Sequence, residues 1–390
     1  MTFKIPFFVT ETINTLQKNG YEAYMVGGCV RDILMGITPH DYDVTTNALP
    51  NQVKELFDRT VDTGIKHGTI TVIWDKNTVE VTTYRTESNY TDNRHPDCVS
   101  FVSNLKEDLS RRDFTVNAIC YNEKSGFTDL FGGISDINNK ILKAVGDANI
   151  RFTEDALRIL RLFRFACTLN FKIDKNTYEA ALCCLPLIKN VSIERIAEEL
   201  KKTCLGDNVK ALEQFINSGG LECLGITSCE ELDKISGLSK NIDLRLFALL
   251  SLCDCDADDV AKKLKLSNLS KNTIASLKHL TTNPLPKSKS DIKKILARFD
   301  YNVFISYLEY LSVIKNVSTD EARLLTEEIL NNKEPYKISQ LDIGGNEVIK
   351  LGFAERKVGE ALNFLLESVI ENPNYNKKET LIEFLKNYRN

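Results

Sequence analysis

The hydrophobic period of this chain changes once, near residue 153, and this change limits the folds open to it more than any other feature. Before that point, short β-branched stretches bounded by Gly, Asn or Asp predict strands, at 23–26, 41–46, 69–74 and 78–84. Helical stretches lie between them, at 29–35 and at 50–57. The first third of the chain therefore predicts an α/β layer built on one mixed sheet of about five strands.

Beyond residue 153, the apolar positions follow a helical period over most of the chain. Glycines at 206, 219 and 220 and the proline-containing stretch 283–290 break this pattern into segments. We therefore expect an α+β fold, in which a mixed-sheet head is followed by an elongated all-helical neck, body and tail. The predicted division places the head at 1–141, the neck at 142–200, the body at 201–272 and the tail at 273–390.

Charge and hydropathy exclude several classes of protein. The 390 residues carry 50 basic and 54 acidic side chains, for a net charge of −4. A protein that coats nucleic acid without specificity would be strongly basic, so any contact with RNA or nucleotide must come from local arginine clusters. No stretch approaches the ~18 consecutive apolar residues of a membrane helix, and the first residues lack a secretory signal pattern. We expect no membrane partner.

Cysteine and histidine usage bounds the chemistry further. Eleven cysteines, an odd number, and only four histidines are spread along the chain without a C-x-x-C pair. This pattern supports neither a disulfide framework nor a zinc site. We therefore expect no zinc and a reducing compartment, the cytoplasm. The sequence leaves the oligomeric state unknown.

The segment GGCVRDILMGITPHDYDVTT, at 27–46, joins a strand, a glycine pair, a helix and a second strand. Glycine lets the backbone approach a ligand, and the helix start at Gly28 turns free N–H groups toward an anion, to which Arg31 adds a planar donor. Asp41 and Asp43 are two apart on the second strand and are expected on one face, where their repulsion favours a cation such as Mg²⁺. A strand end with two solvated aspartates is the alternative.

Two further charged groups precede the helical part. Glu80 lies in a predicted strand among β-branched neighbours, where a carboxylate needs a partner. It is either a third acid near the metal or the partner of a lysine on the next strand. In EDLSRRDFTVNA, at 107–118, Arg112 adds a guanidinium group, and Asp113 fits the cap of a helix. Exposed arginine pairs are common, so this second motif predicts no function by itself.

The third motif, TEDALRILRLFRFA, occupies 153–166. Thr153 is the expected N-cap of a helix, and the two acids after it suit its first turn. Of the eleven positions from 156 to 166, eight are apolar and the other three are Arg158, Arg161 and Arg164. Guanidinium groups within an apolar helix need anionic or hydrogen-bonding partners. Those partners are either internal carboxylates or the phosphates and base of a nucleotide.

These three motifs, in this order, resemble the class II tRNA nucleotidyltransferases, which are the CCA-adding enzymes and the related bacterial poly(A) polymerases. SIERIAEELKK at 192–202 resembles a fifth element of the family, and 85–104 resembles the flexible loop of enzymes that complete the whole CCA end. The segment 344–369 resembles the family's tail more distantly. No H-D phosphohydrolase signature is present, so the domain that some relatives append is not expected.

The resemblance implies a polymerase-β-like nucleotidyltransferase head and a division of labour among the motif residues. Asp41 and Asp43 would hold two Mg²⁺ ions, with Glu80 as a possible third ligand. The nucleotide would be bound by Gly28, Arg31, Arg112, Asp155, Arg158, Arg161 and Arg164. The loop at 85–104 would help the pocket switch from CTP to ATP, and the later helices would hold tRNA.

Base selection without a template has a physical explanation. Cytosine and adenine both present an exocyclic amine beside a ring nitrogen, so Asp155 would accept from the amine while Arg158 donates to the ring. Guanine and uracil place a carbonyl oxygen where the amine would be, and a mispaired polar group carries a penalty. Three residues apart, the two side chains are expected to share one helix face. The alternatives are a poly(A) polymerase, an enzyme that adds only A, and a non-catalytic tRNA-binding module.

Overall fold

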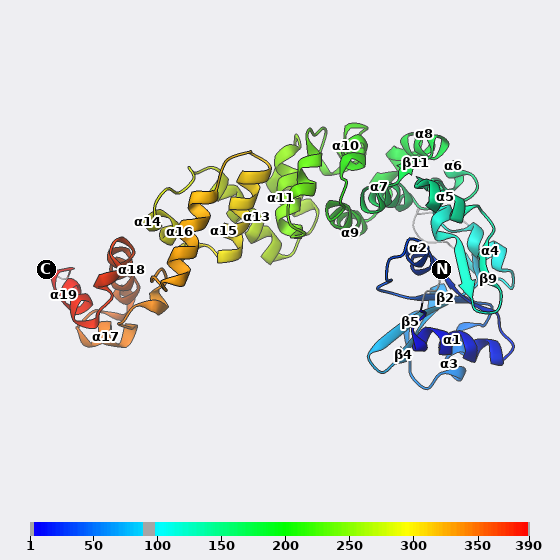
Figure 1. Cartoon of the computed structure of the whole chain (residues 1–390), viewed down its shortest axis with the longest axis horizontal. Coiled ribbons are helices and arrows are strands. Elements are labelled where there is room, and N and C mark those ends of the chain that lie inside the picture. The colour runs from blue at the N-terminus through cyan, green and yellow to red at the C-terminus, as the bar shows by residue number, and fades with distance from the viewer. Residues whose placement is uncertain (1–3, 89–97, 389–390) are drawn as a thin grey trace. The chain divides into compact units, whose positions relative to one another are not determined.

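The computed structural model describes residues 4–88 and 98–388. The structure falls into two compact units (Figure 1). Unit 1 comprises Met1–Leu232 and Cys253–Lys265, and unit 2 comprises Asp233–Leu252 and Leu266–Asn390. The four-part division into head, neck, body and tail is finer than this and stays a prediction. Two of its boundaries, near 200 and 272, fall inside helices.

A seven-stranded mixed sheet forms the first part of unit 1, in the order β3-β4-β5-β2-β1-β8-β9. Only β2 and β5 pair in parallel among these neighbours. The strands are β1 (Ala23–Val26), β2 (Asp43–Thr46), β3 (Thr60–Gly64), β4 (Thr69–Trp74), β5 (Asn77–Thr83), β8 (Ile119–Asn122) and β9 (Gly126–Asp129). The mixed sheet is confirmed, whereas its predicted size of about five strands is wrong.

The strands that the sequence pattern did not reveal are β3, β8 and β9. The edge strands β3 (TVDTG) and β9 (GFTD) are short and polar, as is usual at an edge, so they lack a clear apolar alternation. The sequence of β8 follows directly on the second arginine motif. Outside the sheet, β6 (Arg85–Ser88) pairs with β7 (Cys98–Phe101). The loop predicted to switch nucleotides lies partly outside the described residues, at 89–97.

Helices pack on this sheet through regularly spaced apolar side chains. In α1, for example, Val9, Ile13 and Leu16 are buried, as the 3.6-residue period requires. The helices of the sheet region are α1 (Phe7–Lys18), α2 (Gly28–Leu34), α3 (Pro50–Leu56), α4 (Leu105–Ser110) and α5 (Gly133–Asn139). Figure 1 shows α1 and α3 beside the strands β2, β4 and β5.

The rest of unit 1 is helical and centres on α7 (Leu157–Leu169), which is buried over most of its length. Phe163 of α7 stacks on Phe215 of α10 with ring centroids 4.5 Å apart. The helices are α6 (Ala148–Glu154), α7, α8 (Lys175–Cys184), α9 (Ile193–Cys204), α10 (Lys210–Asn217) and α12 (Ala257–Lys263). Two short parallel strands, β10 (Ile141–Leu142) and β11 (Lys172–Ile173), flank α7 in sequence.

The start of the arginine-rich helix differs from the prediction. Thr153 does not cap it but lies in the last turn of α6, where its hydroxyl donates to the carbonyl of Asn149. The chain is extended at Asp155 (φ −143°, ψ 103°), and α7 begins only at Leu157. Local preference favours helix throughout this segment, so the break reflects tertiary contacts rather than sequence propensity.

Unit 2 is all helical among its described residues. Its helices are α11 (Ile242–Leu252), α13 (Asn268–Thr281), α14 (Lys289–Arg298), α15 (Tyr301–Val313), α16 (Asp320–Asn331), α17 (Gly345–Lys350), α18 (Glu355–Glu371) and α19 (Lys378–Tyr388). The short 3-10 helices of the chain are η1 (Ile65–His67), η2 (Thr115–Asn117), η3 (Leu185–Asn190), η4 (Glu222–Leu224), η5 (Leu232–Gly237), η6 (Ile338–Gln340) and η7 (Pro373–Tyr375). In the described part of the chain, no helix combines the length and the apolar character that a membrane crossing needs.

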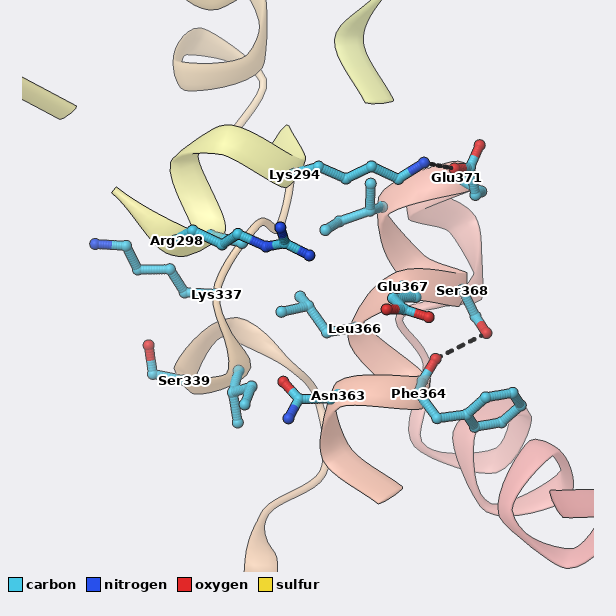
Figure 2. Close-up of a pocket in the computed structure, with 13 residues that line it drawn as sticks. Lys294, Arg298, Lys337, Ser339, Asn363, Phe364, Leu366, Glu367, Ser368 and Glu371 are labelled. Atoms are coloured by element: carbon cyan, nitrogen blue, oxygen red, sulfur yellow. Dashed lines mark hydrogen bonds and ion pairs between the residues drawn. The ribbon is translucent and has the colours of Figure 1, made fainter. Parts of the chain in front are cut away.

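A large open cavity of about 1150 Å³ lies within unit 2, between α14, η6 and α18 (Figure 2). Charges of both signs line it, and Lys294 pairs there with Glu371 at 2.7 Å. None of the residues predicted to act on a nucleotide lines this cavity. The motif residues of unit 1, and not this cavity, therefore locate the candidate active site.

Candidate active site

The turn between β1 and α2 depends on Gly27, whose φ of +80° is a conformation that side chains disfavour. A Cβ atom at this position would lie 3.1 Å from Nη1 of Arg112 and 4.0 Å from Oδ2 of Asp43. The backbone therefore passes close to a carboxylate from the far end of its own motif and to a cation from the second motif. The sequence prediction named Gly28, which begins α2, but the residue under conformational constraint is Gly27.

Asp43 begins β2 and is the register partner of Glu80 on the parallel strand β5. Burial raises the pKa of the Asp43 carboxyl to about 6; Arg112 opposes the rise, while the charges of Glu80 and Asp41 add to it. Asp41 is exposed and precedes the strand. The strand predicted over 41–46 is thus two residues too long, and the argument from one strand face is wrong for Asp41, although its charge acts on Asp43.

Arg112 pairs with a buried acid of its own motif. Its Nη2 lies 3.5 Å from Oδ2 of Asp108, which is fully buried. Although burial pushes the pKa of the Asp108 carboxyl up, the guanidinium groups of Arg111 and Arg112 bring it below its usual value. The Nε–H of Arg112 is buried and has no hydrogen-bond partner among the described residues. One buried donor of the second motif is thus left unsatisfied, as expected of a group that awaits an anionic ligand.

A chain of polar contacts runs from α2 to α7. Nη1 of Arg31 donates to Oδ1 of Asn117 at 2.7 Å, and Nδ2 of Asn117 donates to Oδ1 of Asp113 at 3.0 Å. Asp113 pairs in turn with Arg161 at 2.7 Å. Burial opposes ionisation of Asp113, but Arg161 and the Asn117 amide lower the pKa of its carboxyl to about 2. Asp113 therefore does not cap the following helix; it anchors α7 to the sheet region.

Three guanidinium groups surround the ring of Phe165 on α7. The distances from Cζ to the ring centroid are 5.1 Å for Arg31, 5.3 Å for Arg161 and 4.0 Å for Arg164. Cations over an aromatic face are attracted by its quadrupole. Phe165 thus gathers an arginine from the first motif and two from the third at one place.

Each arginine of α7 also has a carboxylate partner, as the alternative to nucleotide binding predicted. Arg158 pairs with Glu154 at 2.6 Å, and Arg164 pairs with Glu199 of α9 at 2.9 Å. Burial lowers the pKa of Arg164 to about 10, and the neighbouring positive charge of Arg161 adds to this decrease. Positive charge is therefore concentrated at this place in spite of the ion pairs. The cluster is therefore both internally paired and suited to a further anion.

Asp155 and Arg158 are held separately rather than on one helix face, so that expectation is wrong. Arg195 of α9 contacts both carboxylate oxygens of Asp155, at 3.2 and 2.7 Å. Arg158 donates instead to Glu154 and to the carbonyls of Arg151 and Arg111. Asp155 lies at the break between α6 and α7, and Arg158 lies in α7. Their side chains are 17% and 10% exposed.

The sequence prediction missed several residues that build this site, namely Asn117, Phe165, Arg195 and Glu199. Asn117 and Phe165 lie inside the quoted motifs, where an amide after the arginine pair and a ring next to Arg164 were the available signals. Arg195 and Glu199 belong to the segment at 192–202, whose charged residues carried no spacing that pointed to α7. Their partners are far away in sequence, so only the fold brings them together.

The donor set near Asp43 fits a magnesium ion. In the part of the chain that the structure describes, no group of three or more His, Cys, Asp or Glu side chains forms a preformed cage. Mg²⁺ commonly uses one or two carboxylates and completes its coordination with water and substrate phosphates. The half-buried Asp43 carboxyl, raised in pKa by desolvation and by neighbouring acids, has the charge repulsion that such a cation would relieve. Asp41 and Asp43 are the two candidate ligands.

Comparisons with known proteins agree with this geometry. Residues 23–143 match the family model of the poly(A) polymerase head domain, and 170–224 match a model described as a probable RNA- and SrmB-binding site of polymerase A. The CCA-adding enzyme of Lactobacillus delbrueckii subsp. bulgaricus is 36% identical over 389 residues, which cover 96% of each protein. Most of the chain therefore has a counterpart in this relative.

Solved structures extend the likeness to the whole fold. The Bacillus stearothermophilus CCA-adding enzyme in complex with CTP has a TM-score of 0.85 at 28% identity, covering 99% of this chain and 98% of that one. The Thermotoga maritima CCA-adding enzyme complexed with tRNA shares the fold at 19% identity, with a TM-score of 0.68 over 98% of this chain and 95% of that one. The predicted α+β fold, a mixed-sheet head followed by helices, is confirmed.

Fold and site together define a nucleotidyltransferase, with the carboxylates of a mixed-sheet head placed beside an arginine-rich helix. The near full-length identity to a curated relative then decides the family. The chain belongs to the family of CCA-adding enzymes and poly(A) polymerases, as its motifs predicted.

Proposed function

We propose that this chain adds C, C and A to the 3′ end of tRNA from CTP and ATP, releasing pyrophosphate, without a template. The observation that carries this proposal is the 36% identity to a CCA-adding enzyme over 96% of both proteins. The convergence of the carboxylates and arginines of three motifs in unit 1 supports it. The RNA 3′-OH attacks the α-phosphate of the nucleotide, so the protein must position two substrates and stabilise developing charge.

Asp41 and Asp43 are the proposed holders of Mg²⁺. When bound, two such ions would activate the attacking hydroxyl and neutralise the leaving group. The chain's own contribution is to place two carboxylates at the start of β2, opposite the Gly27 turn. Glu80 is exposed and is the register partner of Asp43, so it adds negative charge to the cluster and is a possible further ligand.

The arginines around Phe165 and the turn after β1 are the proposed nucleotide site. Arg31 and Gly28 would contact the phosphates and sugar, and Arg112, whose Nη1 lies near the Gly27 turn, offers an Nε–H that is unpaired among the described residues. Arg161 and Arg164 would line the same pocket. Guanidinium groups fixed by internal partners need little reorganisation when the triphosphate binds, so the ion pairs of α7 serve this function rather than exclude it.

Asp155 and Arg158 are the proposed readers of the base. Two of the five N–H groups of Arg158, on Nε and Nη2, are not used by the contacts to Glu154, Arg111 and Arg151. The carboxylate of Asp155 can accept from the exocyclic amine of cytosine or adenine. We expect Asp155→Ala to weaken selection against UTP and GTP. Unchanged nucleotide choice in that variant would contradict the assignment.

The helices after the head would hold the tRNA, and the residues at 273–390 are the proposed tRNA-binding tail. The match of 170–224 to a probable RNA-binding family model supports an RNA partner for the helical part. The cytoplasm remains the proposed location, from the cysteine pattern of the sequence.

One reaction separates this proposal from its rivals. Full-length protein is incubated with Mg²⁺, either a tRNA that lacks its CCA end or one that ends in CC, and labelled CTP, ATP or both, and product lengths are resolved on a gel. Three added nucleotides with both substrates support CCA addition. A ladder of A supports poly(A) addition, which the head-domain match makes the specific rival; a single A added only to tRNA ending in CC supports an A-only enzyme. No extension by native protein supports a binding module.

A further inference from the structure

Asp155, the proposed base reader, forms an ion pair with a residue from another helix. Arg195 lies near the start of α9, donates from Nη1 to Oδ1 of Asp155 at 3.2 Å, and donates from Nη2 to Oδ2 at 2.7 Å. This is the paired geometry of an arginine on a carboxylate, which fixes the plane as well as the position of the acid. α9 packs along α7, so the carboxylate is held by a rigid element and not by a loop.

The hydrogen bonds of Asp155 leave one acceptor direction of its carboxylate open. Oδ1 also accepts from the backbone N–H of Leu157 at 3.0 Å, so Oδ1 has both of its acceptor directions filled. Among the residues that the structure describes, Oδ2 accepts only from Arg195 and keeps one acceptor direction open, because a carboxylate has about four in all. The open direction belongs to an acceptor-only group held in one orientation. It suits an N–H donor of a base and repels a carbonyl oxygen at the same place.

We propose that Arg195 is a specificity-determining positioning residue, which holds Asp155 so that a single lone pair faces the exocyclic amine of CTP or ATP. This proposal rests on the proposed function. Without Arg195, Asp155 sits at the extended break between two helices with only the Leu157 N–H to orient it. Its carboxylate could then rotate away from a carbonyl oxygen, and UTP and GTP would be rejected less well.

The test compares four nucleotides in full-length enzyme. kcat/KM is measured for CTP, UTP, ATP and GTP on tRNA ending at the position each step requires. Arg195→Gln is expected to lower the preference for CTP over UTP, and for ATP over GTP, by about tenfold or more, as loss of a bidentate contact does. Arg195→Lys keeps the positive charge and most of the aliphatic side chain but lacks the planar guanidinium that binds both oxygens of Asp155, so it is expected to lose discrimination too. It serves as a second variant if Arg195→Gln folds poorly.

A matched control and a double variant separate positioning from a general structural role. Lys202→Gln, on the same helix, removes only an exposed pair with Glu198 and is expected to leave the preference unchanged. If Arg195 acts through Asp155, Arg195→Gln is expected to have no further effect on discrimination in an Asp155→Ala background. Effects that multiply in the double variant would overturn the proposal.

Two other outcomes also decide against it. A uniform fall in kcat/KM for all four nucleotides, with ratios unchanged, would assign Arg195 to folding alone. Full discrimination in Arg195→Lys would mean that a point charge suffices and that the planar guanidinium orients nothing. These results differ from failure of the proposed function itself, in which the native protein would not add C, C and A to tRNA.

Discussion

The guanidinium of Arg31, on α2, lies over the ring of Phe165, on α7, with 5.1 Å between Cζ and the ring centroid. Arg31 follows the turn at Gly27, whose backbone approaches Asp43 and Arg112. Carboxylates and arginine-rich helix therefore belong to one cluster in unit 1. A transfer reaction needs this juxtaposition, because the metal ligands must lie near the groups that bind the triphosphate.

Asp43→Asn tests the metal-binding role. The variant keeps the shape of the side chain but removes the charge that a divalent ion needs, so we expect kcat for nucleotide addition to fall by at least about 10²–10³-fold. Binding of tRNA should change little. Single-turnover extension and a filter-binding titration measure the two quantities. Asp75→Asn, in the exposed turn between β4 and β5, is the matched control and should behave as native; a fully active Asp43→Asn enzyme would exclude the role.

The Asp43 carboxyl also makes the free energy of unfolding depend on pH and on magnesium. Because the pKa of Asp43 in the folded protein, about 6, exceeds its ordinary value of 3.8, ionisation disfavours the fold, and this cost grows as pH rises from about 4 through 6. In EDTA, Asp43→Asn is therefore expected to be more stable than native at pH 8, by at most about 3 kcal/mol, and equally stable near pH 4.

Thermal unfolding at pH 8 and near pH 4 tests whether Asp43→Asn is more stable than the native protein only at the higher pH. Added Mg²⁺ should raise the Tm of the native protein at pH 8, because ion binding stabilises only the folded form, and should raise that of Asp43→Asn less. Equal shifts in both proteins would place the ion elsewhere.

The order of elements could be predicted from sequence because it depends on local pattern. Alternation in the first third and helical period afterwards gave the mixed-sheet head and the helical remainder, and the motif at 27–46 gave its strand–turn–helix. The polar edge strands β3 and β9 could not be predicted in this way. A strand at the edge of a sheet pairs on one side only and is often short and polar, so its sequence lacks the apolar alternation of an inner strand.

The candidate site was predictable as a set of residues but not as a set of contacts. Asp113 and Arg161 form an ion pair across 48 positions, and Arg195 reaches Asp155 across 40. Such pairs depend on how α7 and α9 pack, and the spacing of residues within one segment does not show this packing. The break at Asp155 has the same origin, because the sequence on both sides favours helix while its carboxylate is bound by Arg195 and by Leu157 N–H.

Gly27→Ala tests the close approach at the first turn. A methyl group there would meet Arg112 at 3.1 Å in a backbone conformation with φ of +80°, so we expect Arg112 to shift and the KM for nucleotide to rise about tenfold or more. Gly20→Ala is the control, because Gly20 has a φ of +87° with nothing within 4 Å of the added carbon. Both variants carry a backbone cost, of about 1–3 kcal/mol, but only Gly27→Ala should change nucleotide kinetics. Equal KM values in the two variants would contradict the close approach.

Asp113→Asn tests the link between the sheet region and α7. The pKa of Asp113 in the folded protein is about 2, below its ordinary 3.8, so its ionised form stabilises the fold at pH above about 4 and this stabilisation is lost as pH falls toward 2. We expect the variant to lose about 2–3 kcal/mol of unfolding free energy at pH 7, and the difference from native to shrink below pH 4.

Urea unfolding from pH 7 to pH 3 measures this difference. Asp62→Asn, which breaks the exposed pair with Lys54, provides the control, and such a surface pair is worth about 1 kcal/mol or less. If Asp113 anchors α7, its variant should also show weaker nucleotide binding, because Arg161 loses the closer of its carboxylate partners, Asp113 at 2.7 Å, and keeps Glu199 at 3.9 Å. A destabilised variant with native nucleotide affinity would separate the anchor from the site, and a variant as stable as native would show that the buried pair does not hold α7 in place.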